Sequence, residues 1–170
     1  MEIRTIRPDE WRELRDLRLR ALADAPDAFG ATYDEELASP DEAWRLRADR
    51  PDRMIFVAVD DTGRFMGMGS GGPAPDAPGF GAIYGMWVDP AARGQRVGEG
   101  IIRAIAAWAT AAGYERIGLG VTVGNAPAIA LYERLGFRDL GMRYPLREGT
   151  DLEIQLMGTS LAELTAYFES

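Results

Sequence analysis

The run Val88-Asp89-Pro90-Ala91-Ala92-Arg93-Gly94-Gln95-Arg96-Val97-Gly98 decides the fold class, because it joins a predicted strand to a predicted helix. Residues 82–88 are apolar, and the Asp-Pro pair ends that strand. Apolar residues then recur at helical spacing over residues 97–112, and Gly113 is a natural C-cap. The free N–H groups and positive dipole end of such a helix favour a diphosphate at the loop.

The composition of this loop also suits a phosphate. Gly94 and Gly98 let the backbone come close to a ligand, and Arg93 and Arg96 place two cations together. The loop is neither the dinucleotide fingerprint G-x-G-x-x-G nor a P-loop, which requires a lysine. Glycine-rich strand-to-helix turns also serve as plain connections, so the loop by itself leaves both interpretations open.

A second strand and helix follow directly. Residues 116–123 predict a strand, and Asn125 is a typical N-cap with Pro127 in the first turn of the next helix. The apolar stripe of that helix includes Ala128 and Tyr132, and Gly136 ends it. Cofactors bind such sheets where neighbouring strands diverge, which here lies between residues 88 and 123.

The other segments complete an α/β (α+β) pattern with a mixed sheet, whose antiparallel front half leads into a β–α–β crossover. We expect a single domain over residues 1–170. Its remaining elements are a strand at 2–7, a helix opened by Pro8, an irregular stretch at 26–40 that contains Asp34-Glu35-Glu36, a helix at 41–50, hairpin strands at 54–59 and 64–69, a loop at 71–81, a strand at 151–157 and a short terminal helix within 159–170.

Composition restricts the chemistry. The chain has no cysteine and no histidine, and all 19 of its basic residues are arginine. Catalytic Cys, His and Lys are therefore excluded, and no metal site of the usual zinc ligands is expected. The net charge of −8 argues against nucleic-acid binding. It either favours a cationic substrate or only keeps the protein soluble.

Targeting signals are not apparent in the sequence. No apolar run is long enough to span a membrane, and the N-terminus lacks the pattern of a signal peptide. We therefore expect a soluble, cytoplasmic protein without a membrane partner.

Two motifs together resemble the GNAT superfamily of N-acetyltransferases. The loop is similar to its acetyl-CoA motif, Q/R-x-x-G-x-G/A after a V-x-P strand end, and residues 125–137 are similar to N-x-x-A-x-x-L-Y-x-x-x-G-F. The resemblance implies a mostly antiparallel sheet of six to seven strands, about four flanking helices and a splayed strand pair that holds the cofactor. Arg96 departs from the motif, since it occupies the position of the middle glycine, and a positive φ there would disfavour it.

The resemblance also implies which residues bind acetyl-CoA as a co-substrate. Backbone groups on the strand that ends at Val88 would pair with the pantetheine arm, whereas the side chains of that strand belong to the core. The implied cofactor residues are Met86, Trp87, Val88, Arg93, Gly94, Gln95, Arg96, Val97, Gly98, Glu99, Asn125, Ala128 and Tyr132.

For catalysis, the resemblance implies direct attack of the acceptor amine on the thioester. Tyr132 matches the tyrosine that acts as general acid toward the departing sulfur, although its helical spacing also permits a structural role. The resemblance does not identify the general base that would deprotonate the amine, because residues 81–84 hold no carboxylate. Glu35 or Glu36 is proposed as the base, and the further candidates are Asp76 and Glu153. A water relay or a neutral amine would remove the need for a base.

We expect the acceptor to be a small-molecule amine, and the acidic stretch at residues 34–36 suits a cationic one. The alternatives are a protein or peptide Nα-acetyltransferase and a CoA-binding sensor without turnover. A homodimer is possible by family habit.

Overall fold

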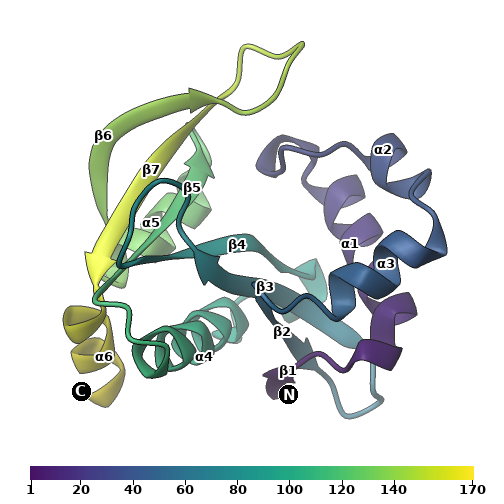
Figure 1. Cartoon of the computed structure of the whole chain (residues 1–170), viewed down its shortest axis with the longest axis horizontal. Coiled ribbons are helices and arrows are strands. Elements are labelled where there is room, and N and C mark those ends of the chain that lie inside the picture. The colour runs from purple at the N-terminus through teal and green to yellow at the C-terminus, as the bar shows by residue number, and fades with distance from the viewer.

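One seven-stranded sheet runs through the fold, in the order β1-β2-β3-β4-β5-β7-β6. The computed structural model describes residues 1–170, and Figure 1 shows the sheet open like a V at its centre. Only β4 and β5 are parallel, so the predicted mixed and mostly antiparallel sheet is confirmed. The strands are β1 (Glu2–Thr5), β2 (Met54–Val59), β3 (Phe65–Pro73), β4 (Phe80–Val88), β5 (Arg116–Thr122), β6 (Arg138–Pro145) and β7 (Glu153–Ser160).

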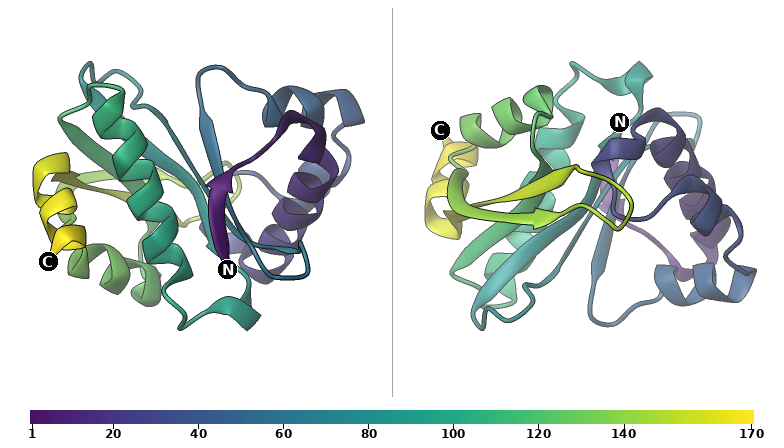
Figure 2. Two further views of the ribbon diagram at one scale, coloured as in Figure 1. Left: turned by 90° about the horizontal axis from the view of Figure 1, so that it is seen from below. Right: turned by 90° about the horizontal axis from the view of Figure 1, so that it is seen from above.

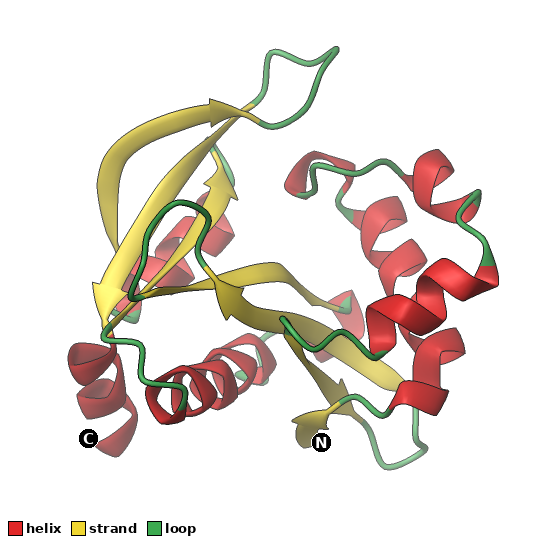
Figure 3. Ribbon diagram, viewed as in Figure 1, coloured by secondary structure: helices red, strands yellow, loops and turns green.

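Six α-helices flank the sheet, more than the four or so expected from the sequence. The first three cover one face of the β1–β4 half, and the fourth lies on the opposite face (Figure 2 and Figure 3). The helices are α1 (Trp11–Asp24), α2 (Tyr33–Leu37), α3 (Asp41–Ala48), α4 (Val97–Ala111), α5 (Ala126–Arg134) and α6 (Leu161–Glu169).

The core lies on both faces of the sheet. On one face, Ile101 and Ile105 are fully buried, and their helix α4 packs against β2, β3 and β4. The glycines of β3 make this contact possible, because a Cβ added at Gly71 would meet the ring of Trp108 at 2.6 Å. On the other face, α1 and α3 pack a second apolar cluster around Trp44.

Several element boundaries differ from the sequence prediction. The helix opened by Pro8 starts as a 3-10 turn, Pro8–Glu10, and α1 follows it. The predicted loop at 71–81 is shorter, because β3 continues to Pro73 and β4 begins at Phe80. The last strand, β7, continues to Ser160, whose hydroxyl then caps α6 by accepting from Glu163 N at 3.2 Å.

The irregular acidic stretch contains a helix that periodicity could not predict. The helix α2 has only five residues, which is too few for an apolar stripe. A capping box forms it: Thr32 Oγ1 accepts from Glu35 N at 3.3 Å, and the Glu35 carboxylate accepts from Thr32 N at 2.9 Å.

None of the helices combines the length and the apolar character needed to span a bilayer. The edge strand β6 exposes Leu140, Met142 and Tyr144 to solvent. Nothing else in the structure bears on assembly, so the homodimer stays a prediction.

Candidate active site

The parallel pair β4–β5 opens partway along its length. The two strands pair from Phe80 and Arg116 as far as Ile83 and Leu119. Beyond this point β4 continues to Val88 and β5 to Thr122 without pairing to each other. Backbone groups on the facing edges therefore have no strand partner and are available to a ligand. This opening is the splayed strand pair that the resemblance implied.

A bulge in β4 accompanies the opening. Against β3, Tyr84 pairs with Ser70 and Trp87 with Met68, so two residues of β4 lie opposite Gly69 alone. One of the two is Gly85, whose φ of +61° is accessible mainly to glycine. The bulge turns the end of β4 away from the regular sheet.

A cavity of about 80 Å³ lies between the diverging strands, and we call it the strand cleft. Four of the predicted cofactor residues line it, namely Met86, Asn125, Ala128 and Tyr132. Its other lining residues are Ala28, Phe29, Ile83, Gly85, Leu119, Gly120, Val121 and Thr122.

The N-terminus of α4 lies at the far end of β4. The first i to i−4 bond of the helix runs from Gly100 N to Arg96 O at 2.9 Å, which leaves the N–H groups of residues 97–99 free. A Cβ added at Gly98 would stand 3.6 Å from Val88 Cγ2, so the helix end lies directly against the end of the strand. Free N–H groups and the open edge of β4 thus form one continuous surface.

Arg96 adopts the positive φ that disfavours a non-glycine residue at this position of the motif. Its φ of +58° and ψ of +22° are left-handed. An L-residue other than glycine pays about 1 kcal/mol for this conformation, which glycine adopts freely. The loop therefore has at this position a conformation that glycine, the usual residue of the motif here, would adopt without strain.

Of Arg93 and Arg96, the two arginines expected to bind phosphate, only Arg96 has a guanidinium that is not already engaged. The guanidinium of Arg93 is occupied, since Nε donates to Val88 O at 3.0 Å and Nη2 donates to the Asp24 carboxylate. Arg96 is exposed and has no carboxylate partner. Two other expected cofactor side chains are also engaged: Gln95 Nε2 donates to Ala91 O at 3.2 Å, and Glu99 pairs with Arg134 at 3.5 Å.

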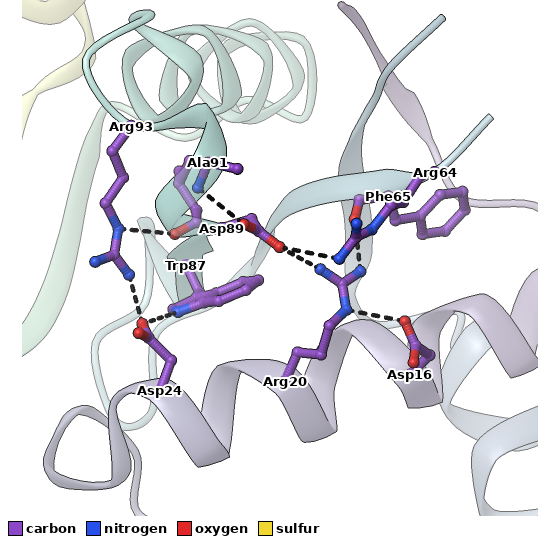
Figure 4. A network of polar contacts seen from close by, with 10 residues as sticks. Asp16, Arg20, Asp24, Arg64, Phe65, Trp87, Asp89, Ala91 and Arg93 are labelled. Carbon is purple, nitrogen blue, oxygen red and sulfur yellow. Dashed lines mark hydrogen bonds and ion pairs between the residues drawn. The ribbon is translucent and has the colours of Figure 1, made fainter. Parts of the chain in front are cut away.

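Arg93 belongs to a polar network that fastens α1 to the end of β4 (Figure 4). As the sequence predicted for side chains of this strand, the Trp87 ring belongs to the core: it lies in the α1 cluster, and its Nε1 donates to Asp24 at 2.9 Å. Nearby, Arg20 donates to the Asp89 carboxylate at 2.5 Å and to Phe65 O at 2.6 Å.

No local sequence signal predicts this network. Asp24 and Arg20 occupy one helix, but apart from Asp16, which Arg20 also binds, the residues they bind lie more than 40 positions away in the chain. Its effect is to fix the loop between β4 and α4 relative to α1.

Tyr132 reaches the strand cleft from α5. It is buried, and burial raises the pKa of its hydroxyl to about 12. That hydroxyl forms no hydrogen bond within the protein, while its ring packs against Phe137 with centroids 5.9 Å apart. At physiological pH the group is therefore a neutral O–H with a proton to donate. Asn125 caps the same helix, since its Oδ1 accepts from Ala128 N at 3.4 Å.

Neither glutamate proposed as the base is free to act as one. Glu35 completes the capping box of α2 and lines neither cavity described here. Glu36 is 5% exposed and accepts from Arg18 Nε and from Arg47 Nη1, each at 3.0 Å. Burial alone would raise the pKa of Glu36, but the two arginines outweigh it and lower the pKa. Such a carboxylate is a poor proton acceptor.

The other carboxylates proposed as bases are also remote. Asp76 lies in the β3–β4 loop and Glu153 begins β7; both are exposed, and neither lines a cavity described here. The expectation of a cation-binding acidic stretch is wrong at Glu36, because the charge of this residue is already paired with two arginines.

A larger cavity of about 320 Å³ adjoins the strand cleft, and we call it the arginine pocket. It shares Ala28, Phe29 and Gly85 with the strand cleft. No sequence motif predicts this pocket, since its four arginines come from α1, α3 and the segment after α3. The residues that line only this pocket are Leu14, Arg18, Gly30, Glu36, Arg47, Arg50, Arg53, Ile55, Met68, Gly69, Ser70 and Tyr84.

Known proteins are similar to this chain in sequence and in fold. The model of the Acetyltransferase (GNAT) family matches residues 9–137. A mycothiol acetyltransferase from Salinispora arenicola is 34% identical over 79% of this chain and 44% of its own length. A streptothricin acetyltransferase from Streptomyces lavendulae is 35% identical over 55% of this chain and 53% of its own length. The chain spans about half the length of these curated relatives.

Solved structures share the fold. A Salmonella typhimurium protein solved with acetyl-CoA as its cofactor superposes with a TM-score of 0.72 and 20% identity, over 95% of this chain and 94% of that one. At this identity the likeness concerns the fold alone.

Proposed function

Because the chain belongs to the GNAT acetyltransferase family and is thus an N-acetyltransferase, we propose that it transfers an acetyl group from acetyl-CoA to a small-molecule amine by direct attack in a ternary complex. One observation carries the proposal: the β4–β5 pair opens beyond Ile83 and Leu119, and the opening leads to the free N-terminus of α4. The two motifs that resemble the family form the two ends of this opening.

The residues present fit acetyl-CoA. Free N–H groups at residues 97–99, the helix dipole and the Arg96 guanidinium would hold the diphosphate. The unpaired edge of β4 would hydrogen-bond the amide groups of the pantetheine arm, as an added strand would. The thioester supplies the activated acetyl group, and the narrow strand cleft would exclude water from it.

Tyr132 is suited to the departing sulfur. Its hydroxyl stays protonated, has no competing partner in the protein and lies at the strand cleft. A neutral donor in a buried site stabilises a developing negative charge more strongly than it would in water. The raised pKa favours donation of a hydrogen bond to the sulfur over full ionisation of the tyrosine.

We assign no side chain as the base. Glu36 is the only carboxylate that lines either cavity, and it is held by two arginines. The amine would lose its proton to water or arrive neutral. Direct attack on the thioester also needs no enzyme nucleophile, which agrees with a chain that lacks Cys, His and Lys.

The relatives support a small acceptor, since their names specify acetylation of mycothiol and streptothricin. The size of the arginine pocket agrees, because 320 Å³ is near the lower end of small-molecule sites. A peptide Nα-acetyltransferase and a non-catalytic CoA sensor are the alternatives that the experiment must separate.

The experiment measures acetyl-CoA binding and CoA release side by side. At about a hundred times Kd, acetyl-CoA should raise Tm by roughly 5 to 10 °C. CoA release over a panel of small amines and peptides should depend on the amine. Tyr132→Phe should keep the Tm shift but lower kcat about a hundredfold, whereas Tyr144→Phe on the exposed strand β6 should change neither.

The possible results separate the hypotheses. No Tm shift with acetyl-CoA contradicts the proposal, and a shift without release from any amine indicates the sensor. Release with peptides alone indicates the protein-directed enzyme.

A further inference from the structure

The arginine pocket is positively charged within an acidic protein. Four of its lining residues are arginines, and Glu36 is its only carboxylate, although the whole chain has a net charge of −8. The overall charge therefore does not explain the pocket. Arginines lining a concave surface are typical of sites that bind carboxylate or phosphate.

The single carboxylate does not neutralise the pocket. Glu36 is shared between Arg18 and Arg47, so one negative charge faces two positive ones. A guanidinium has five N–H donors, and these contacts use two on Arg18 and one on Arg47. Aromatic rings fix both cations in place: Arg18 lies 4.5 Å from the ring centroid of Phe29, and Arg47 lies 4.4 Å from that of Trp44.

A further arginine has no anionic partner at all. The guanidinium of Arg53 stacks on Tyr84 at 3.8 Å from the ring centroid, and its buried Nε has no hydrogen-bond partner. The neighbouring Asp52 is engaged by Arg50 through bonds of 2.9 and 2.7 Å. Burial lowers the pKa of Arg53, assisted by the charge of Arg50, so its cation is destabilised where it stands. A bound anion would satisfy both the charge and the free N–H.

The pocket is placed to present such a ligand to the strand cleft. The two cavities meet at Gly85, in the bulge of β4, and a Cβ added there would stand 3.4 Å from Arg18 Nη1. Tyr84, under Arg53, directly follows the last residue of β4 that pairs with β5. An anion held by these arginines would thus lie beside the point where the strands part.

We propose that the acceptor is a small amine that also carries an anionic group, a carboxylate or a phosphate, which the arginine pocket binds while the amine faces the strand cleft. This inference rests on the proposed function and specifies its acceptor. It replaces the cationic acceptor that net charge favoured, because the local arginines, not the distant surface carboxylates, contact the ligand.

The test uses matched amines and the full chain saturated with CoA. β-Alanine is compared with β-alaninamide, and phosphoethanolamine with ethanolamine, at equal ionic strength. Binding is titrated by NMR or calorimetry, and kcat/KM is measured separately with acetyl-CoA by CoA release. The variants are Arg53→Gln, Arg53→Lys and, as a surface control, Arg103→Gln on the exposed side of α4.

The anionic member of at least one pair should bind tenfold or more tightly than its neutral partner. Arg53→Gln should abolish that preference, Arg53→Lys should retain most of it, and Arg103→Gln should leave it unchanged. The two pairs separate a carboxylate from a phosphate acceptor.

Equal binding of both members, or tighter binding of the neutral one, overturns the inference, even where CoA release supports the acetyltransferase. If tighter binding of the anionic amine depends on Arg53 but no amine causes CoA release, the result supports the anion site and contradicts the proposed function.

Discussion

The proposed cofactor side and the proposed acceptor side of this site are built in different ways. The cofactor side consists of main chain: an open edge of β4, a left-handed loop and the free N–H groups of α4. The acceptor side consists of long side chains from α1, α3 and the segment after α3, and those of α1 and α3 are joined through Glu36. One surface depends on backbone conformation, the other on ion pairs between distant segments.

This difference predicts how each surface responds to substitution. A backbone surface persists when most of its side chains change, so its chemistry can be kept across a family. A surface made of side chains changes with single substitutions, so acceptors can differ between relatives that share one cofactor. Experiments that perturb one side and leave the other intact therefore test the comparison directly.

The largest expected effect is on the pH dependence, because neither side of the site offers a free carboxylate base. With an alkylamine acceptor of pKa about 10.4, the neutral fraction rises tenfold per pH unit below that value. We expect kcat/KM to rise about a thousandfold from pH 6 to pH 9, and to level only at the pKa of the acceptor. A plateau at a lower pH that stays fixed when the acceptor changes would reveal a base on the enzyme.

On the acceptor side, Glu36→Gln should destabilise the protein by about 3 kcal/mol at pH 7, since it leaves Arg18 and Arg47 without their shared carboxylate. The pKa of Glu36 is lowered by folding, so its stabilisation is complete above the unfolded pKa of about 4.3. It is lost as pH falls through the lower folded value. Urea unfolding at pH 7 and pH 3 measures both effects, and the difference between wild type and variant should shrink at pH 3.

Glu42→Gln is the matched control, because Glu42 forms only an exposed pair with Arg45. Its effect should stay below about 1 kcal/mol. Equal effects for the two variants would show that Glu36 does not organise the arginine pocket.

The same contrast explains how far the sequence could predict the structure. The strand, loop and helix around residues 88–98 follow from local signals, namely the Asp-Pro stop, the glycines and helical spacing. The acceptor side has no such signal. Glu36 was proposed as the base, whereas it is held by Arg18 and Arg47; these partners lie 18 and 11 residues away, and nothing local relates them.

The side chain of Arg93 was mispredicted for the same reason. It stands in the stretch that resembles the cofactor motif and was expected to face phosphate, but it turns toward Asp24 of α1. A motif specifies main-chain shape, whereas tertiary contacts decide where the side chains point. The left-handed Arg96, by contrast, was foreseeable, because its position in the motif belongs to glycine.

Asp24 joins α1, which supplies Arg18 to the arginine pocket, to Trp87 and Arg93 beside the cofactor loop, and its substitution should weaken this connection. Asp24→Ala should cost about 1.5 kcal/mol, because the buried Nε1 of Trp87 loses its acceptor. Arg93 loses a carboxylate as well, so we expect acetyl-CoA to bind a few-fold more weakly through a less ordered loop. Chemical unfolding and a calorimetric titration measure the two quantities.

Asp16→Ala is the control for this change, since Asp16 is itself exposed and its loss leaves the bonds of Arg20 to Asp89 and Phe65 O in place, so it should matter little. Unaltered acetyl-CoA affinity in Asp24→Ala, despite the loss of stability, would mean that α1 does not order the cofactor loop.

The smallest expected effect is a difference in stability between two Arg96 variants, which separates the backbone strain at this residue from the effect of its charge. Arg96→Gly and Arg96→Ala both remove the guanidinium, so both should weaken acetyl-CoA binding to a similar extent. Only glycine adopts the φ of +58° freely, and alanine keeps the strain. The glycine variant should therefore be more stable than the alanine variant by about 1 kcal/mol in urea unfolding. Equal stabilities would place Arg96 outside the left-handed region in solution, and the cofactor loop would then carry no strain at this residue.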